Sequence, residues 1–245
     1  MEAYKLVFGG MNKILKKVQE TQGKNIKKAA QLVANTIMDG GIIHAFGAGH
    51  SNLLAEEISF RAGTLVPINH IIDISISGTV NVVKSSYIER LEGIGSIIFN
   101  HVRPNPKDIF IVISNSGRNA APIEIARDAQ KNGHKVIALT SVAYSKSQKS
   151  RHSSGKLLLD CADIVLDNCG IEGDICVKHP DMVQGLAPTS TVAGAFILHA
   201  TLTQAVFIMK NEGYKPPVFM SGNFDEGMKF NKVLLDSYWD RMRNW

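Results

Sequence analysis

Hydrophobic and polar positions follow two different rhythms along the chain. In residues 1–40, apolar side chains recur every three or four positions, as at Ile14 and Val18, which predicts amphipathic helices. A break at Gln22-Gly23 divides this stretch into two helices. The second helix ends at Gly40-Gly41, because glycine readily adopts the left-handed conformation that terminates many helices.

From residue 41 onward, short and wholly apolar runs alternate with helical patterns. Strands without polar alternation are buried on both faces, so this order predicts a parallel sheet between two helical layers. The expected fold is α/β, a three-layer α/β/α sandwich preceded by a helical arm. The predicted strands are residues 42–46, 64–68, 109–113, 135–140 and 163–166, and the predicted helices are about 52–62, 122–132, 190–211 and 230–239.

Length and composition agree with one large core that carries extensions. The 245 residues are 44% apolar and 20% charged, which excludes disorder as the main state. We divide the chain into an N-terminal helical arm (1–40), an α/β domain (41–213) and a C-terminal extension docked on that domain (214–245). No uninterrupted apolar run reaches the roughly 18 to 20 residues that a membrane-spanning helix requires, so no membrane contact is expected.

Charge and cysteine usage narrow the expected partners. The net charge is +5, and the early lysines alternate with apolar residues, which is typical of a solvated helix face rather than of a nucleic-acid interface. A small anionic ligand suits this charge.

No secretory signal is visible and three cysteines make no disulfide framework, so the cytoplasm is the expected compartment. No metal or cofactor is expected, because the spacing is too irregular for a zinc motif at Cys161, Cys169, Cys176 and His179.

Two polar loops follow predicted strands and precede predicted helices. In the first, Gly47-Ala48-Gly49-His50-Ser51, the glycines let the backbone approach an anion, and the helix start offers unpaired N–H groups. A dinucleotide fingerprint would need a third glycine where Asn52 stands, and no Gly-Lys-Ser/Thr triplet of a P-loop occurs. The loop with Gly47, Gly49 and Ser51 is therefore a candidate phosphate site.

The second loop is Ser114-Asn115-Ser116-Gly117-Arg118-Asn119. Such a serine-rich turn can equally be an ordinary helix cap. The carboxyl ends of parallel strands meet at one edge of a sheet, however, and ligands bind at that edge. Two such loops on one sheet predict a joint site, to which the second contributes Ser114, Asn115, Ser116 and Asn119.

These loops resemble the two phosphate loops of the SIS, or sugar isomerase, domain family. Residues 185–191, Gly-Leu-Ala-Pro-Thr-Ser-Thr, also resemble the turn before the last helix of arabinose-5-phosphate isomerases. The resemblance covers about residues 24–212 and implies a flavodoxin-like sheet and a phosphosugar whose phosphate binds Ser51, Ser114 and Ser116. It further implies a homodimer with the site near the interface, which the apolar face of residues 1–40 favours independently.

Other segments resemble particular members of this family. Residues 51–57, together with Arg61, are similar to a helix of hexulose-phosphate isomerases, whereas residues 85–93 and 116–118 are similar to N-acetylmuramic acid 6-phosphate etherases. The helix-turn-helix domain of SIS-type transcription regulators is not visible. As a whole, the chain is similar to a bacterial branch of single-domain SIS proteins.

Interconversion of an aldose and a ketose phosphate requires an acid and a base, commonly glutamate and histidine. Glu57 lies beside an apolar helix stripe, where a carboxylate is partly desolvated, although a structural ion pair is the alternative. Glu89 and Glu92 are three residues apart, which on a helix would make them either an acid/base pair or a solvated face. His199 lies among apolar residues, either as a catalytic base, as in some SIS isomerases, or as a core histidine.

These residues lead to three functional hypotheses. The favoured one is an aldose/ketose phosphosugar isomerase in which Glu57, Glu92 and His199 transfer protons. The second is a non-catalytic phosphosugar sensor, and the third is an etherase-like lyase acting on an amino-sugar phosphate. An enzyme is favoured over a regulator because no output module is visible in the sequence.

Overall fold

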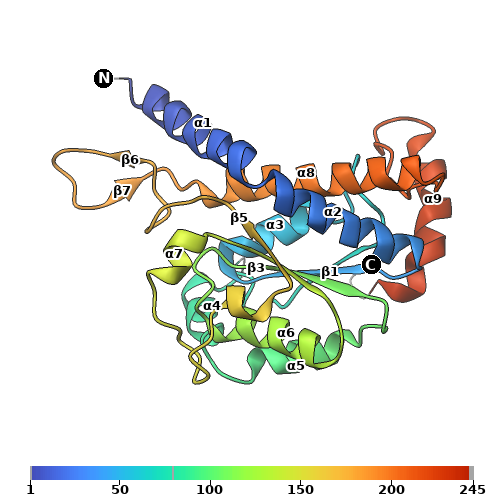
Figure 1. Ribbon diagram of the computed structural model, residues 1–245, viewed down its shortest axis with the longest axis horizontal. Coiled ribbons are helices and arrows are strands. Elements are labelled where there is room, and N and C mark those ends of the chain that lie inside the picture. The colour runs from blue at the N-terminus through green and yellow to red at the C-terminus, as the bar shows by residue number, and fades with distance from the viewer. Residues whose placement is uncertain (1, 79, 243–245) are drawn as a thin grey trace.

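The computed structural model describes residues 2–78 and 80–242. Its centre is a five-stranded parallel sheet in the order β2-β1-β3-β4-β5, with helices on both sides (Figure 1). This is the order of flavodoxin-like sheets, and it confirms the predicted three-layer α/β/α sandwich. The strands are β1 (Ile43–Gly47), β2 (Ile68–Ile71), β3 (Ile109–Ile113), β4 (Val136–Thr140) and β5 (Ile164–Asp167).

Alternate residues of each strand face two separate hydrophobic cores. In β3, Ile109, Ile111 and Ile113 face one core, whereas Phe110 and Val112 face the other. The first core is covered by α1 (Ala3–Thr21), α2 (Gly23–Met38), α3 (Asn52–Glu57) and α8 (Ser190–Asn211). The second is covered mainly by α5 (Ile94–Val102), α6 (Ala120–Lys131) and the 3₁₀ turn Leu158–Cys161, and α4 (Val82–Ile88) contributes Ile88.

Helix α8 is a central element of the first core. Among the described residues it is the one helix whose length and apolar composition would suffice to cross a membrane. Its buried residues, including Ile197 and Leu202, instead pack in the core that α2 shares with the sheet. These buried residues lie on one side of the helix, and the exposed side also carries apolar residues such as Phe196 and Phe207, so the helix has almost no polar stripe.

Several boundaries differ from the predicted ones. The helix expected at 52–62 ends at Glu57, and Phe60 adopts a positive φ of 46° that a helix cannot accommodate. The second strand lies at Ile68–Ile71 rather than 64–68, because Leu65 instead pairs with Val218 of the tail. Helices α4 and α5 were not predicted; α5 begins after Gly93, a glycine in the left-handed conformation that interrupts the helical pattern.

The remaining elements are α7 (Val142–Lys146), β6 (Val177–Lys178), β7 (Gly185–Leu186), α9 (Gly227–Tyr238) and the 3₁₀ turns Gly49–Ser51 and Trp239–Arg241.

The C-terminal segment is held against the sheet region by backbone and side-chain contacts. Val66 N donates to Pro217 O, and Phe219 N donates to Thr64 O. Near the end, the Arg241 guanidinium binds the buried Asp108 carboxylate at 2.6 Å. Burial works to raise the pKa of Asp108, but hydrogen bonds from His44 and two backbone N–H groups lower it to about 2. The predicted three-part division of the chain remains a prediction.

Candidate phosphosugar site

The two polar loops meet where the strand order reverses. β1 pairs with β2 on one side and with β3 on the other, so β1 and β3 flank the topological switch point at which open α/β sheets bind ligands. A cavity of about 330 Å³ lies at the carboxyl ends of these strands. The predicted residues that line it are Gly49, Ser51, Ser114, Asn115, Ser116 and Asn119.

The first loop turns sharply because it contains two glycines. A Cβ at Gly47 would come within 2.3 Å of the Ser51 backbone oxygen, so no side chain fits there. Gly49 has a φ of +55°, which favours glycine. Gly47 thus shapes the turn rather than lining the cavity, and it allows Gly49 and Ser51 to reach the cavity wall.

The second loop is held from behind by neighbouring strands and loops. Asn115 Oδ1 accepts a hydrogen bond from Asn168 Nδ2 at 2.8 Å, and Gly117 N donates to Ser114 Oγ at 3.2 Å. Asn119 occupies the N-cap position of α6, but its side chain does not cap the helix. Asn119 Oδ1 instead accepts from Arg151 Nη1 at 2.9 Å. The helix-cap alternative is therefore wrong for Asn119, whose amide faces polar neighbours around the cavity.

Glu89 lines the same cavity as the two loops. Burial raises the pKa of its carboxyl, against the opposing effect of a hydrogen bond from Asn119 and nearby arginines. The predicted arrangement, in which Glu89 and Glu92 share a helix face, is wrong, because α4 ends at Ile88. In the sequence, Glu89 stands out only through its spacing from Glu92. Its place in the cavity depends on the path of the chain after α4.

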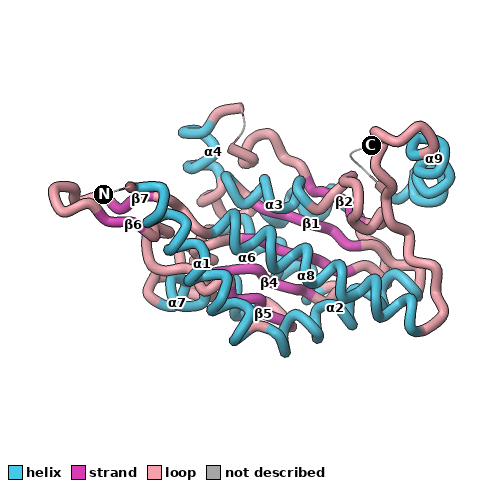
Figure 2. Tube along the Cα trace, turned by 90° about the horizontal axis from the view of Figure 1, so that it is seen from above, coloured by secondary structure: helices cyan, strands magenta, loops and turns pink. Residues whose placement is uncertain are grey.

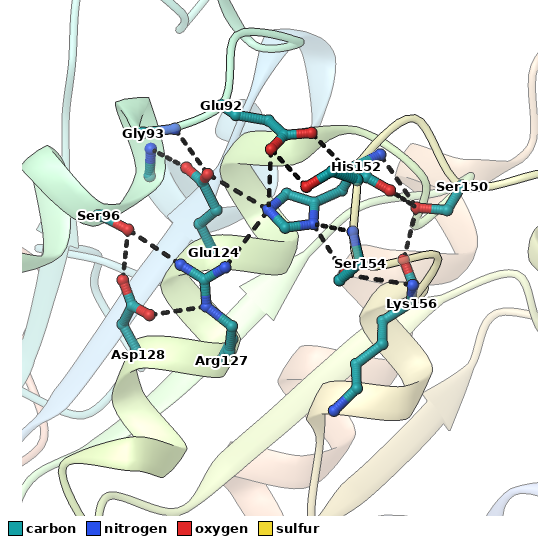
Figure 3. Close-up of polar contacts among 12 residues, drawn as sticks. Glu92, Gly93, Ser96, Glu124, Arg127, Asp128, Ser150, His152, Ser154 and Lys156 are labelled. Carbon is teal, nitrogen blue, oxygen red and sulfur yellow. Dashed lines mark hydrogen bonds and ion pairs between the residues drawn. The ribbon is translucent and has the colours of Figure 1, made fainter.

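Glu92 lies in a separate polar cluster shown in Figure 3. Its two carboxylate oxygens accept hydrogen bonds from Ser153 N at 2.5 Å and Ser153 Oγ at 2.7 Å. These hydrogen bonds lower the pKa of Glu92. The side chain is exposed and is not among the residues that line the 330 Å³ cavity.

A buried pair completes this cluster, which we call the clamp (Glu92, Glu124, His152 and Ser153). Glu124 accepts hydrogen bonds from the backbone N–H groups of Gly93 and Gly95, at 2.6 and 2.8 Å. His152 Nε2 lies 3.4 Å from Glu124 and 3.9 Å from Glu92 (Figure 3). The clamp therefore joins the turn that follows Glu89 to the loop that contains Arg151.

Glu57 and His199 come together, but on another surface. His199 Nε2 lies 3.0 Å from Glu57 Oε1, and Arg61 Nη1 donates to Glu57 Oε2 at 3.0 Å. Glu57 and Arg61 line a wider depression of about 630 Å³ between α3 and α8. The His199 side chain is 38% exposed, so it is not a core histidine. The ion pair of Glu57 with Arg61 matches the structural alternative considered for Glu57.

Asp174 is a polar residue that sequence reasoning did not single out. Its carboxylate accepts hydrogen bonds from Thr189 N and Ser190 N, both at 2.9 Å, and so caps the start of α8. It also lines a small cavity of about 150 Å³ between Ser51 and Thr191. In the part of the chain that the structure describes, no three His, Cys, Asp or Glu side chains are arranged to hold a metal ion.

The fold and the cavity define an α/β protein with a polar ligand site at the switch point of a parallel sheet. The sequence pattern of the SIS domain matches residues 8–141. A UPF0309 protein of Geobacillus kaustophilus is 41% identical over 235 residues, covering 96% of this chain and 94% of the relative. The chain therefore belongs to the SIS domain family and, within it, to the UPF0309 proteins.

Solved structures with the same fold include a phosphoheptose isomerase and a protein complexed with ManNAc-6P. The phosphoheptose isomerase GmhA from Neisseria gonorrhoeae has a TM-score of 0.55 and 19% identity, over 83% of this chain and 97% of that one. The Vibrio vulnificus NanR protein complexed with ManNAc-6P has a TM-score of 0.51 and 14% identity, over 99% and 71%. At these identities the likeness establishes a shared fold.

Proposed function

We propose that this protein binds a sugar phosphate in the 330 Å³ cavity and isomerises it between its aldose and ketose forms. The observation that carries the proposal is that both glycine- and serine-containing loops line one cavity together with the half-buried Glu89. Hydroxyl groups such as those of Ser51 and Ser116 suit the phosphate oxygens. The glycine turn of the first loop provides the close backbone approach that a phosphate requires.

Glu89 is the best candidate for the proton-transfer group in this cavity. Its raised pKa lies closer to neutral pH than that of an exposed glutamate, which favours general acid–base catalysis. In the reaction, the carboxylate would take a proton from the carbon next to the carbonyl and return it to the neighbouring carbon. His50 also lines the cavity, and in this reaction it would exchange a proton with a sugar oxygen.

The test is a panel of hexose, pentose and amino-sugar phosphates, measured for binding and for conversion. We expect at least one compound to bind and to be interconverted with its isomer. Binding should weaken in Ser116→Ala and remain unchanged in Ser237→Ala, whose hydroxyl bonds within α9 far along the chain. Failure of every compound to bind would overturn the proposal.

A non-catalytic sensor is the second candidate, and the ManNAc-6P in the NanR complex makes amino-sugar phosphates relevant to it. Tight binding of one compound without conversion would replace the isomerase by the sensor. Release of the ether substituent from an amino-sugar phosphate, rather than isomerisation, would indicate the lyase. The panel therefore separates all three functions with one set of ligands.

We also propose that the active form is a cytoplasmic homodimer. The first half of α1 extends beyond the sheet (Figure 1), and its Tyr4 and Phe8 are exposed. The β6–β7 hairpin projects on the same side (Figure 2), with Met182 and Val183 exposed at its tip. Apolar side chains on projecting elements are typical of surfaces that a second copy covers. Light scattering should give twice the 26.7 kDa chain mass; a particle of one chain mass would contradict the dimer.

A further inference from the structure

Three arginines lie next to Glu89 and Asn119, two residues that line the cavity. Arg151 Nη1 donates to Asn119 Oδ1 at 2.9 Å, and Arg151 N donates to Arg118 O at 2.8 Å, so the two segments lie side by side. Arg90 follows Glu89 directly, and its guanidinium lies over the Tyr87 ring. All three therefore lie next to the part of the cavity wall that Glu89 and Asn119 form, and their charges act on one another.

These arginines lack the carboxylate partners that surface arginines commonly have. Within the described residues, none of Arg90, Arg118 and Arg151 forms an ion pair. Glu172 is close by but accepts a hydrogen bond from Gln148 instead. The charge of Glu89 acts on Arg151, but burial, together with the like charges of Arg118 and Arg90, lowers the pKa of Arg151. The cluster of Arg90, Arg118 and Arg151 therefore carries positive charge that no carboxylate of the described residues neutralises in an ion pair.

Arg118 also carries a buried donor without an acceptor. Its Nη1 donates to Gln148 Oε1 at 2.7 Å, whereas its Nε is buried and has no hydrogen-bond partner among the described residues. An unpaired buried donor is costly, so such groups commonly have a ligand or a water molecule as partner. The planar edge of a guanidinium matches the two oxygens of a carboxylate or phosphate.

We propose that this arginine cluster binds a second anionic group of the ligand, so that the substrate class is a sugar phosphate that also carries a carboxylate or a second phosphate. The inference rests on the proposed phosphosugar site and specifies its ligand further. The hydroxyls of Ser51, Ser114 and Ser116 hold the first phosphate, and the guanidinium groups of Arg118 and Arg151 hold the second oxyanion. Glu89 lines the cavity and is close enough to Arg151 for their charges to interact, so it would then lie beside the sugar carbons.

The position of the cluster is fixed by the clamp. Arg151 lies between Ser150 and His152, and the contacts of His152 and Ser153 tie this loop to the turn after Glu89 (Figure 3). A loop held in this way keeps the backbone at Arg151 in place before the ligand arrives. Such preorganisation reduces the free-energy cost of ordering the site on binding.

The experiment compares three binding probes by calorimetry: glucose 6-phosphate, 6-phosphogluconate and glucose 1,6-bisphosphate. We expect the carboxylate probe, the bisphosphate probe or both to bind at least about ten-fold more tightly than glucose 6-phosphate, as hydrogen bonds to a charged group imply. The two doubly anionic probes distinguish a carboxylate from a second phosphate. Equal affinity for all three probes would overturn the second anion site but leave the phosphosugar site standing, whereas binding of none would overturn both.

Variants assign any preference to particular residues. Arg118→Gln and Arg151→Gln should abolish the preference for the doubly anionic probe, and Arg118→Lys should restore only part of it, because lysine lacks the planar edge. Lys149→Gln is the matched control, since it removes one exposed positive charge from the same loop and should keep the full preference. Loss of the preference in Lys149→Gln as well would show general charge attraction and overturn the assignment. Unfolding curves for each variant exclude loss of the fold as the cause.

Discussion

Glu89 and Glu57 both lie near the carboxyl edge of the sheet, yet they have different surroundings. Glu89 lines the cavity between the two serine loops, and burial raises the pKa of its carboxyl. Glu57 is 30% exposed and is paired with both Arg61 and His199. Both carboxylate oxygens of Glu57 are already engaged by these partners, whereas Glu89 forms no ion pair with the described residues and lines a polar cavity, where it can act on a ligand. The difference favours Glu89 for proton transfer and a structural role for Glu57.

The largest expected effect is that of Glu89→Gln on turnover. A positioned acid or base contributes about 10² to 10⁴-fold in rate, so kcat should fall by that factor while the binding constant changes little. Steady-state kinetics and calorimetry on the same preparation measure the two quantities. Retention of full kcat would remove Glu89 from the mechanism and leave the Glu57–His199 pair as the next one to test.

The next effect concerns affinity rather than rate. Ser116→Ala should weaken phosphosugar binding by about 1.5 to 3 kcal/mol, the contribution of a hydrogen bond to a charged group. Because Ser116 would hold the phosphate in the ground and transition states alike, kcat should change much less than KM. The opposite pattern, with kcat lowered and KM unchanged, would mean that the hydroxyl acts on the reacting carbons.

A smaller effect is expected in the pH dependence of kcat/KM. Glu89 is active as a base only when it is deprotonated, so kcat/KM should rise with pH through a pKa above the ordinary glutamate value of 4.5. Asn119→Ala removes a hydrogen bond that stabilises the charged carboxylate of Glu89. The rising limb of the plot of kcat/KM against pH should therefore shift to higher pH. A limb that stays in place in this variant but moves in Glu57→Gln would reverse the assignment of the two glutamates.

The smallest effect is predicted for Glu57→Gln. The amide oxygen of the substituted side chain can still accept a hydrogen bond from Arg61 or His199, and position 57 lies outside the cavity. We therefore expect kcat to stay within about two-fold of the native value, well below the contribution of a catalytic base. The variant is the matched control for Glu89→Gln because it makes the same chemical change in the neighbouring depression. A large loss of kcat in Glu57→Gln would place the reaction between α3 and α8.

Periodicity sufficed to predict the sheet and its two helical layers. The strands around Ile111 and Ile137 are fully buried and almost wholly apolar, and this pattern has few interpretations other than a buried parallel sheet. The segment from residue 80 to 102 gives a weaker periodic signal, because α4 and α5 are short and are separated by the left-handed Gly93. Without these helices, the place of Glu89 could not be inferred.

The candidate site shows the same division between local and long-range information. Strand ends followed by glycine and serine predicted the loops with Ser51 and Ser116, since their local sequence determines where they lie on a parallel sheet. Spacing from Glu89 pointed to Glu92, and apolar neighbours together with the family resemblance pointed to His199. Neither signal identifies the distant partners of these two residues. Their actual neighbours, Ser153 and Glu57, are 61 and 142 residues away.

The central claim is that a sugar phosphate binds between the loops that follow β1 and β3. A crystal structure with the tightest-binding compound of the panel tests it most directly. The account predicts that the phosphate contacts Ser51 and Ser116 and that the sugar carbons lie against Glu89. A phosphate found instead in the depression between α3 and α8, beside Arg61 and Glu57, would contradict it.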